Sequence, residues 1–270
     1  MDTGPVFDAA CRLCGARTAH RFSKRVLNKY IVHYGECEGC GSLQAEAPYW
    51  LHEAYHSNLA EIDTGAAQRN LNSMAATLAV CKLFGLRNAV DFGGGDGLLC
   101  RLLRDHRINC FVQDRYARTT YAQGFTEPDF QKPDLRLSFE VFEHFGNPQA
   151  DLVAIFDDQP DGVFGSTVNY AGQGADWDYL AADAGQHVFF YSARALESIG
   201  KQYGYDVMLQ GAFFFFVRHH RDNRFKFSLL RHLLRSPSLR VLRTVISALP
   251  ARGAKLDLDA ISRRPTRGAR

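Results

Sequence analysis

Hydrophobic and polar positions follow a pattern that predicts alternating helices and strands. Within the stretch from Thr64 to Gly85, Leu71, Met74 and Leu78 recur at helical spacing. Short apolar runs typical of buried strands follow, at residues 88–92, 109–114, 134–139 and 162–168. Helical patterns separate these runs, at residues 98–105 and 149–156. This alternation is typical of an α/β protein with a mostly parallel sheet.

The pattern continues with one more helix and two short strands. Ser192 is a suitable N-cap for a helix that ends before Gly204, because serine accepts from free backbone N–H groups and glycine adopts the left-handed conformation at a helix end. Two strands around Gly211 are predicted to close the sheet, and the run 213–216, four phenylalanines, is predicted to be a core strand.

A glycine-rich turn joins the strand at 88–92 to the next helix. Asp91, Gly93, Gly95 and Gly97 alternate as acid-x-Gly-x-Gly-x-Gly. So abrupt a reversal needs positive φ, and a cofactor lying against the backbone leaves no room for a Cβ atom. The third glycine follows the second by two residues, unlike the G-x-G-x-x-G of dinucleotide enzymes. The turn predicts a nucleotide-cradling loop, with a plain glycine-rich connection as the alternative.

Polar side chains at the ends of the following strands extend this interpretation. Asp114 ends the next predicted strand about twenty residues beyond the glycines, where an acid in nucleotide-binding α/β units accepts hydrogen bonds from ribose hydroxyls. The alternative for Asp114 is a solvated strand end. Phe139, Glu140 and His144 follow the strand after that. Carboxyl ends of parallel strands share one crevice, so we expect these residues to face the same ligand.

Four of the seven cysteines form two Cys-x-x-Cys pairs, each followed by glycine: Cys11 with Cys14, and Cys37 with Cys40. Four thiolates in tetrahedral reach suit Zn²⁺ and leave no open position for water or substrate, so we predict a structural zinc site. Disulfides and a redox Cys-x-x-Cys are the alternatives. The other three cysteines have apolar neighbours and are predicted to be buried thiols, at positions 81, 100 and 110.

Charge is distributed unevenly, although the net charge is only +3. From Arg218 onward the chain carries fourteen Lys or Arg against three Asp. We interpret this tail as a peripheral helix pair, broken by Pro237, with a solvated basic face; contact with a membrane surface or with RNA is the alternative. No signal-peptide pattern and no apolar run long enough to span a bilayer are present, so we expect a cytoplasmic protein. The predicted domains are residues 1–47, a zinc ribbon, residues 48–217, a nucleotide-binding α/β domain, and residues 218–270, the basic tail.

These pieces, in this order, resemble bacterial class I S-adenosylmethionine (SAM)-dependent methyltransferases with an N-terminal zinc-binding domain, which are often tied to sugar, glycan or antibiotic tailoring. The resemblance rests on the two cysteine knuckles, IDTGAAQRNL, VDFGGGDGLL, FEVFEHFGNP, and W-x-Y followed by GQHVFFYS. It covers the chain from Cys11 to about Val217 and implies a Rossmann-like sheet with an antiparallel last strand, with SAM as the cofactor.

The resemblance also implies residue roles. Gly93 and Gly95 would pass the methionine end of SAM, in a motif that includes Asp91 and Gly97. Asp114 would hold the ribose, and Phe139 or Glu140 would lie near the adenine or the sulfonium. In sugar C-methyltransferases of similar layout, the histidine that opens such an HV-aromatic-S stretch is the general base, here His187. Those enzymes have a glutamate before this histidine and a tyrosine slightly upstream, where this chain has Gln186 and Ala184.

We therefore expect methyl transfer from SAM to a small acceptor, such as a nucleotide-linked sugar or a glycan or secondary-metabolite precursor. His187 is the first candidate base and His144 the second, because an imidazole titrates near neutral pH. An RNA methyltransferase that uses the ribbon and the basic tail is an alternative, but the chain lacks the Asn-Pro-Pro-Tyr type of motif typical of base-amine methylation. The loop between the knuckles is only mildly basic, which does not favour nucleic acid. A non-catalytic binding protein is the third hypothesis.

Overall fold

The structure is a computed structural model, and it describes residues 9–55 and 64–262. Predictions that fall on Ile62 and Asp63, and on the basic end from residue 263, lie outside the described residues. The chain divides into two compact units. The first unit comprises Met1–Gly65 with Ser138–Asn223, and the second comprises Ala66–Leu137 with Arg224–Arg270. Each unit is therefore built from two separate stretches of sequence.

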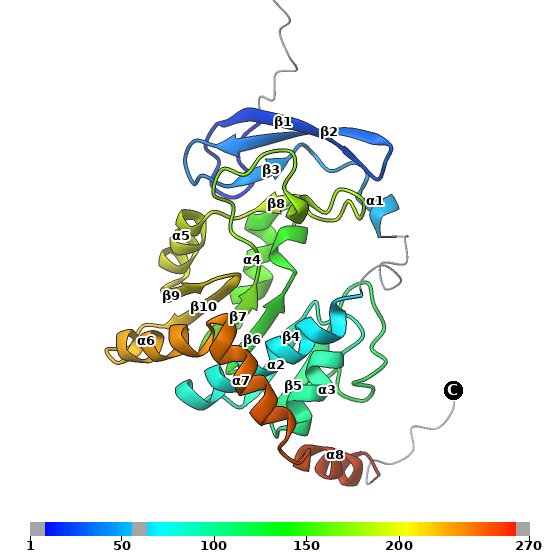
Figure 1. The fold of residues 1–270 in the computed structure, drawn as a ribbon, viewed down its shortest axis with the longest axis vertical. Helices are drawn as coiled ribbons and strands as arrows, with labels where there is room; N and C mark the ends of the chain where they lie inside the picture. Colours follow the sequence, from blue (N-terminus) through cyan, green and yellow to red (C-terminus); the bar gives the residue numbers. More distant parts are fainter. Residues whose placement is uncertain (1–8, 56–63, 263–270) are drawn as a thin grey trace, which may run out of the picture. The chain divides into compact units, whose positions relative to one another are not determined.

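The N-terminal part of the first unit is an antiparallel sheet of four strands (Figure 1). Its strands run in the order β1 (Thr18–Val26), β2 (Tyr30–Cys37), β3 (Leu43–Ala45) and β8 (Phe189–Phe190). The short helix α1 (Leu51–Ala54) follows β3. Tyr34, Trp50 and Phe190 are buried together in one core cluster. The fourth strand thus comes from a segment about 140 residues further along the chain than β3.

The remainder of the first unit has three strands and two helices. The strand β10 (Phe213–Arg218) pairs antiparallel with both β7 (Gly162–Ser166) and β9 (Tyr205–Gln210). The helices are α4 (Pro148–Phe156) and α5 (Ala193–Tyr203), and two 3₁₀ turns are η2 (Phe142–His144) and η3 (Asp178–Leu180). Ser192 accepts a hydrogen bond from the Ala195 N–H and Gly204 is left-handed, which confirms both predicted ends of α5.

The second unit contains the strand that leads into the glycine turn. The strand β4 (Asn88–Phe92) lies between β5 (Asn109–Gln113) and the first residues of β6 (Leu135–Phe139), and it pairs parallel with both. The helices α2 (Ala66–Phe84) and α3 (Leu98–Asp105) precede and follow β4. Cys81, Cys100 and Cys110 are free and buried, which confirms their prediction as core thiols.

Hydrogen bonding orders the strands of the larger sheet as β5-β4-β6-β7-β10-β9. The sheet is mostly parallel, and β10, the last strand within the described residues, runs antiparallel to its neighbours. The mixed α/β fold with an antiparallel last strand confirms the prediction from sequence. The four phenylalanines of the run 213–216 belong to β10, and three of them are buried.

The basic tail is helical within the described residues. It forms α6 (Asn223–Leu233), α7 (Ser236–Ser247) and α8 (Arg252–Ser262). Pro237 lies in the first turn of α7, where a missing N–H costs no helical hydrogen bond, so it begins a helix at this point. The sequence predicted two helices here, and the third, α8, was missed.

Candidate functional site

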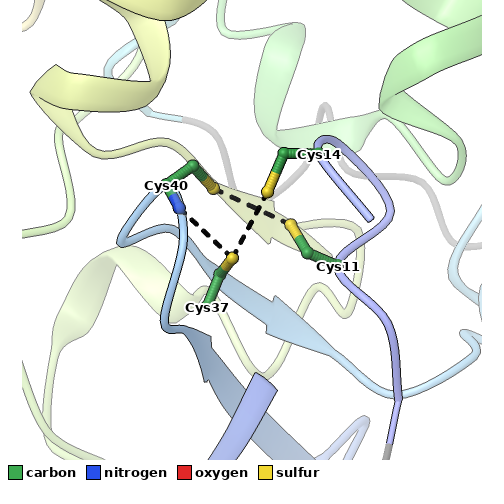
Figure 2. Close-up of side chains that lie close together, drawn as sticks. All are labelled: Cys11, Cys14, Cys37 and Cys40. Atoms are coloured by element: carbon green, nitrogen blue, oxygen red, sulfur yellow. Dashed lines mark hydrogen bonds between the residues drawn. The ribbon is translucent and has the colours of Figure 1, made fainter. Parts of the chain in front are cut away.

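The four predicted ligand cysteines lie together in the first unit (Figure 2). The Sγ atoms of Cys11 and Cys40 are 3.7 Å apart, and those of Cys14 and Cys37 are 3.5 Å apart. These separations are far longer than an S–S bond, so the pairs are not disulfides. The Cys11 thiol lowers the pKa of Cys40 to about 5 by donating a hydrogen bond, despite burial. Four sulfur atoms, all within 4.8 Å of one another, fit a tetrahedral Zn²⁺.

Hydrogen bonds join this N-terminal region to the loop that carries His187. The Ser192 hydroxyl donates to the Cys40 carbonyl (2.5 Å) while it accepts from the Ala195 N–H (3.0 Å). At the other end of the loop, the Trp50 indole donates to the Gly185 carbonyl at 2.8 Å. The loop is therefore held at both ends by residues that precede it by more than 130 positions.

Two further side chains strengthen the same connection. The Arg12 guanidinium donates to the Val188 carbonyl at 2.7 Å and to the Ala45 carbonyl at 3.0 Å. The Gln186 amide donates to the Ala54 carbonyl at 3.0 Å. Gln186 is, with Ala184, one of the two positions at which the sequence was expected to depart from sugar C-methyltransferases of similar layout. Here the Gln186 amide donates a hydrogen bond to a backbone carbonyl, and an ionised glutamate at this position could not donate one.

The glycine turn of the second unit has the predicted conformation. Gly93, Gly95 and Gly97 all have positive φ, at 70°, 57° and 84°. A Cβ atom added to Gly94 would lie 2.4 Å from Asp91 Oδ2, so the turn is closely packed on that side. A Cβ atom added to Gly95 would meet nothing within 4 Å. The turn is thus packed against β4 on one side and open on another, which fits a backbone cradle for a nucleotide cofactor.

Asp114, the residue after β5, lies against this turn. Its Oδ2 accepts a hydrogen bond from the Gly95 N–H at 2.9 Å. Its Oδ1 accepts from the N–H groups of Tyr116 and Ala117, both at 2.7 Å. A carboxylate has about four acceptor positions, so it can accept further hydroxyl hydrogens while it fixes the turn.

Asp91 is a buried carboxyl with an unused acceptor. Its side chain is 2% exposed, and Oδ2 has no hydrogen-bond partner. Burial raises the pKa of Asp91 to about 7, and the charges of Asp114 and Asp96 add to this effect. An unpartnered buried acid beside the glycine turn fits a ligand that brings a positive charge, as SAM does.

The first unit contains a separate cluster of two glutamates, buried Glu143 and half-buried Glu140, around one tyrosine hydroxyl. The Tyr179 hydroxyl donates to Glu143 Oε1 at 2.7 Å and lies 3.3 Å from Glu140 Oε2. Glu140 Oε1 accepts from the Ser166 hydroxyl at 2.5 Å. Burial, and then the charge of Glu143, raise the pKa of Glu140 to about 7. Two acids this close disfavour double ionisation, so the cluster holds a proton near neutral pH.

The backbone of the same segment shows local strain. Glu140 has φ of 54°, a left-handed conformation that is uncommon for a residue with a side chain, and its N–H donates to the Ser166 carbonyl at 3.0 Å. Phe139, the last residue of β6, packs edge-on against Phe164 with ring centroids 5.4 Å apart. The strained turn aims Glu140 at Ser166 and Tyr179, directly after this aromatic contact.

His187 and His144 lie next to each other in the first unit, with ring centroids 5.1 Å apart. The Nδ1 atom of His187 is 2.6 Å from the Tyr179 carbonyl oxygen. A carbonyl can only accept, so Nδ1 carries the hydrogen and Nε2 of the neutral ring keeps its lone pair. Burial lowers the pKa of His187, and burial with the neighbouring His187 charge lowers the pKa of His144 to about 3. Both rings are neutral near pH 7.

Glu143 was missed by the sequence analysis, although it lies between two residues that were singled out. It is fully buried, and its Oε2 has no hydrogen-bond partner. One ligand atom each from Glu143, His144 and His187 lies within 4.8 Å of the other two. A carboxylate and two neutral imidazoles form a donor set found at catalytic divalent-metal sites. The available signal was the acid directly before His144, in a strand-end motif already chosen for function.

A mostly parallel α/β sheet whose glycine turn is fixed by the acid that ends the next strand is typical of nucleotide-binding α/β proteins, and the comparisons with known proteins narrow this class to methyltransferases. Residues 52–210 match a family model described as "Methyltransferase domain". The match covers more than half of the chain, so the chain belongs to this methyltransferase family. The matched residues include neither the cysteine cluster nor the basic tail.

Solved structures with a similar fold are methyltransferases of low sequence identity. One is the methyltransferase domain of bacterial CtHen1-C, at 18% identity over 56% of this chain and 99% of that chain, with a TM-score of 0.41. Another is magnesium protoporphyrin IX methyltransferase from Synechocystis PCC 6803 with bound SAM, at 14% identity over 60% and 85%, with a TM-score of 0.40. Human N-acetylserotonin methyltransferase with SAM has 12% identity over 55% and 52%, with a TM-score of 0.38. No curated protein matches the chain.

Proposed function

We propose that the protein transfers the methyl group of SAM to a small polar acceptor, such as a nucleotide-linked sugar or a glycan or secondary-metabolite precursor, with His187 as the general base. The observation that carries this proposal is the neutral imidazole of His187, whose Nδ1 is fixed on the Tyr179 carbonyl so that Nε2 can accept a proton. The sulfonium of SAM supplies an electrophilic methyl carbon, so the chain's own residues need only align the acceptor and remove one proton.

The glycine turn and its two acids are proposed to hold SAM. The backbone at Gly93 and Gly95 would lie against the methionine end of SAM. Asp114 would accept hydrogen bonds from the ribose hydroxyls while it fixes the turn. The carboxylate of Asp91, on the packed side of the turn, would stabilise the positive charge of the cofactor from beneath the backbone. Phe139 or Glu140 would lie near the adenine or the sulfonium. The resemblance to glycan-tailoring methyltransferases, rather than a feature of the pocket, supports the sugar as acceptor.

Replacing Asp91 with asparagine separates stability from cofactor binding. The folded-state pKa of Asp91 is raised, so its ionisation costs stability progressively as pH rises from about 4 towards 7. Asp91→Asn removes this cost, and we expect the SAM-free protein to gain about 1–3 kcal/mol at pH 7. SAM affinity should fall about tenfold with the lost charge. Urea unfolding at pH 5 and pH 7, with SAM calorimetry, measures both effects.

Asp114→Asn is the matched control for this prediction. Asp114 accepts three backbone N–H groups, so asparagine should destabilise the turn as well as weaken SAM binding. We therefore expect Asp91→Asn to raise and Asp114→Asn to lower the stability of the SAM-free protein, while both variants weaken SAM binding. If Asp91→Asn destabilises the free protein as much as Asp114→Asn does, Asp91 is ionised and satisfied, and the role proposed for it is wrong.

Metal-assisted methyl transfer is the second candidate function, and the cluster of Glu143, His144 and His187 favours it. Glu143 is buried, and no protein group donates a hydrogen bond to its Oε2, so this oxygen is available to a bound cation. Glu143, His144 and His187 would hold a divalent cation, which would supply Lewis acidity that lowers the pKa of an acceptor hydroxyl. In that case His187 would be a ligand and not a base.

The direct test of the proposed function is a screen of small acceptors with SAM, read out as S-adenosylhomocysteine formation by mass spectrometry. Nucleotide-linked sugars and phenols form one set, and short RNA transcripts form the other. We expect turnover with a member of the first set. Turnover on RNA alone, with an apparent affinity that falls steeply with salt, would favour the RNA methyltransferase instead. Absence of SAM binding in calorimetry would favour the non-catalytic binding protein.

A further inference from the structure

The helices of the basic tail bury one face and expose apolar side chains on another. These exposed residues have between 40% and 76% of their surface accessible, and they are Phe225 and Leu229 on α6, Val241 and Val245 on α7, and Leu256, Leu258 and Ile261 on α8. We call them, with the cations between them, the tail surface. Each of the three successive helices exposes large apolar side chains in this way, which is more than the single exposed residues usual in folded proteins.

The helix α7 shows that the outer apolar residues are not needed for its docking. It packs against α2 in the second unit with Leu239 and Ile246, seven residues apart and therefore on one face. Arg243 adds a hydrogen bond of 3.1 Å to Asn72 Oδ1. Val241 and Val245 are four residues apart on the other side of the helix, and both are more than half exposed.

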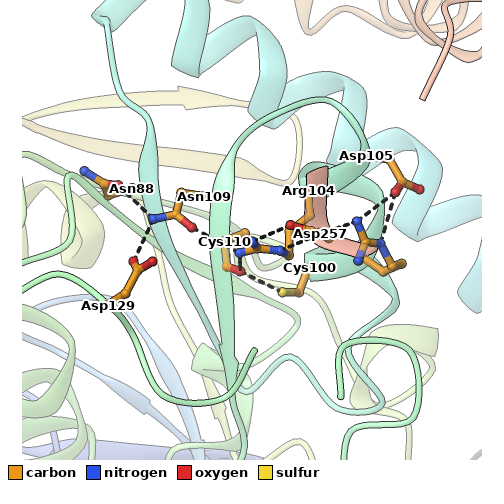
Figure 3. Close-up of polar contacts among 9 residues, drawn as sticks. Asn88, Cys100, Arg104, Asp105, Asn109, Cys110, Asp129 and Asp257 are labelled. Carbon is orange, nitrogen blue, oxygen red and sulfur yellow. Dashed lines mark hydrogen bonds and ion pairs between the residues drawn. The ribbon is translucent and has the colours of Figure 1, made fainter. Parts of the chain in front are cut away.

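The helix α8 reverses the usual arrangement, because it docks by a polar face. Asp257 is bound by both nitrogens of the Arg104 fork, at 2.8 Å and 2.7 Å (Figure 3), and by Arg101 at 2.7 Å. Gly253, one turn earlier, lies so close to α3 that an added Cβ atom would overlap the Arg104 carbonyl. Surface helices normally bury their apolar stripe. The ion pair and the glycine fix α8 with its leucines outward.

Exposed cations are interspersed with these apolar residues along the sequence. Six exposed ones belong to the same segment: Arg224, Arg231, Arg235, Arg240, Arg252 and Lys255. From Arg218 onward fourteen Lys or Arg stand against three Asp, and one of these, Asp257, is already paired inside the unit. The tail surface therefore needs a partner that is both anionic and apolar.

An anionic lipid bilayer meets both requirements. Nucleic acid would match the cations but would leave the leucines and valines without an apolar partner. A second copy of this chain would place cations against cations. None of the described helices is long and apolar enough to cross a bilayer, so contact would be made in the plane of the interface.

We propose that the tail surface of α6, α7 and α8 binds the surface of an anionic membrane, with its exposed apolar side chains at the headgroup boundary and its Arg and Lys side chains on the lipid phosphates. The contact is peripheral and reversible. It is independent of the methyl-transfer chemistry, since none of its residues belongs to the proposed cofactor or acceptor residues.

Vesicle sedimentation of the full-length protein tests the proposal. We expect the protein to pellet with vesicles of equal parts phosphatidylglycerol and phosphatidylcholine, and to stay in solution with phosphatidylcholine alone. Arg240→Gln with Lys255→Gln should weaken binding about fivefold per charge removed. Val245→Ser with Leu258→Ser should weaken it at least tenfold, since two exposed apolar groups no longer enter the interface. Added salt should weaken binding of the native chain.

Ile31→Ser is the control, because Ile31 is an exposed apolar residue of β2, outside the tail, at 49% exposure. It should leave vesicle binding unchanged, and circular dichroism checks that each variant is folded. Equal binding to both vesicle types, or equal loss in Ile31→Ser and the tail variants, would overturn the proposal. So would pelleting without vesicles, which indicates self-association, or tighter binding to an RNA duplex than to the anionic vesicles.

Discussion

If the four-cysteine cluster holds the predicted Zn²⁺, removal of the metal is expected to lower turnover at least tenfold while SAM binding survives. Structural zinc sites contribute about 10–16 kcal/mol of apparent binding free energy to small metal-folded segments, so Cys37→Ser or chelation should unfold the cysteine knuckles. The Cys40 carbonyl would then no longer position the Ser192 hydroxyl. The loop that carries His187 would lose one anchor, and turnover should fall at least tenfold. SAM affinity should change less than about threefold, because the glycine turn belongs to the other unit.

Metal analysis by mass spectrometry, thermal unfolding, SAM calorimetry and turnover together measure this effect. Cys81→Ala is the control, since Cys81 is a buried thiol outside the cluster and its replacement should retain zinc. If zinc-free protein keeps full turnover, the N-terminal region is an independent module and the loop does not depend on it.

His187→Ala is expected to give the second large effect, a loss of turnover of about 10²–10⁴-fold with SAM affinity unchanged. In the native chain, the lowered pKa of His187 places the acid limb of the pH–rate profile below pH 6.5, where the base becomes protonated as pH falls. His219→Ala is the control, because that side chain is 81% exposed and pairs with Asp206. If His187→Ala retains turnover, His187 is neither the general base nor a ligand of a catalytic metal.

His144→Ala and Glu143→Gln distinguish a base from a metal ligand. If His187 is the base, His144→Ala should reduce turnover far less than His187→Ala does. If the three residues hold a cation, both variants should lose turnover together with one equivalent of bound metal beyond the zinc of the cysteine cluster. If the native chain binds only one equivalent of metal, and Glu143→Gln binds the same amount, all of that metal belongs to the cysteine cluster. This result would contradict metal-assisted methyl transfer.

Local sequence spacing predicted those parts of the molecule whose chemistry lies within a few residues. The cysteine knuckles are two short turns, and the glycines need positive φ that few other residues adopt, so both could be recognised without a fold. Asp114 was singled out by its distance from the turn, and the structure adds a hydrogen bond that it accepts from the Gly95 N–H, which the spacing did not predict.

Long-range contacts were beyond this reasoning. Tyr179 joins Glu140 and Glu143 from 36 or more residues away, and no periodicity marks a hydroxyl that will meet two acids. The strand β8 has two residues, too few for an alternating pattern. The helix α8 was missed because pattern analysis looks for an apolar buried face, whereas α8 docks through Asp257 and Gly253.

The pairing of β3 with β8 determines how much of the chain is needed to hold the loop that carries His187. The family match starts at residue 52, yet β8 pairs only with β3 in its sheet, and its loop is anchored by Arg12, Cys40 and Trp50. A protein cut to the matched residues would lack β1, β2 and β3, and would leave Phe189 and Phe190 without a strand partner beside His187. The methyltransferase as an operating unit therefore begins no later than Cys11, forty residues before its recognisable domain.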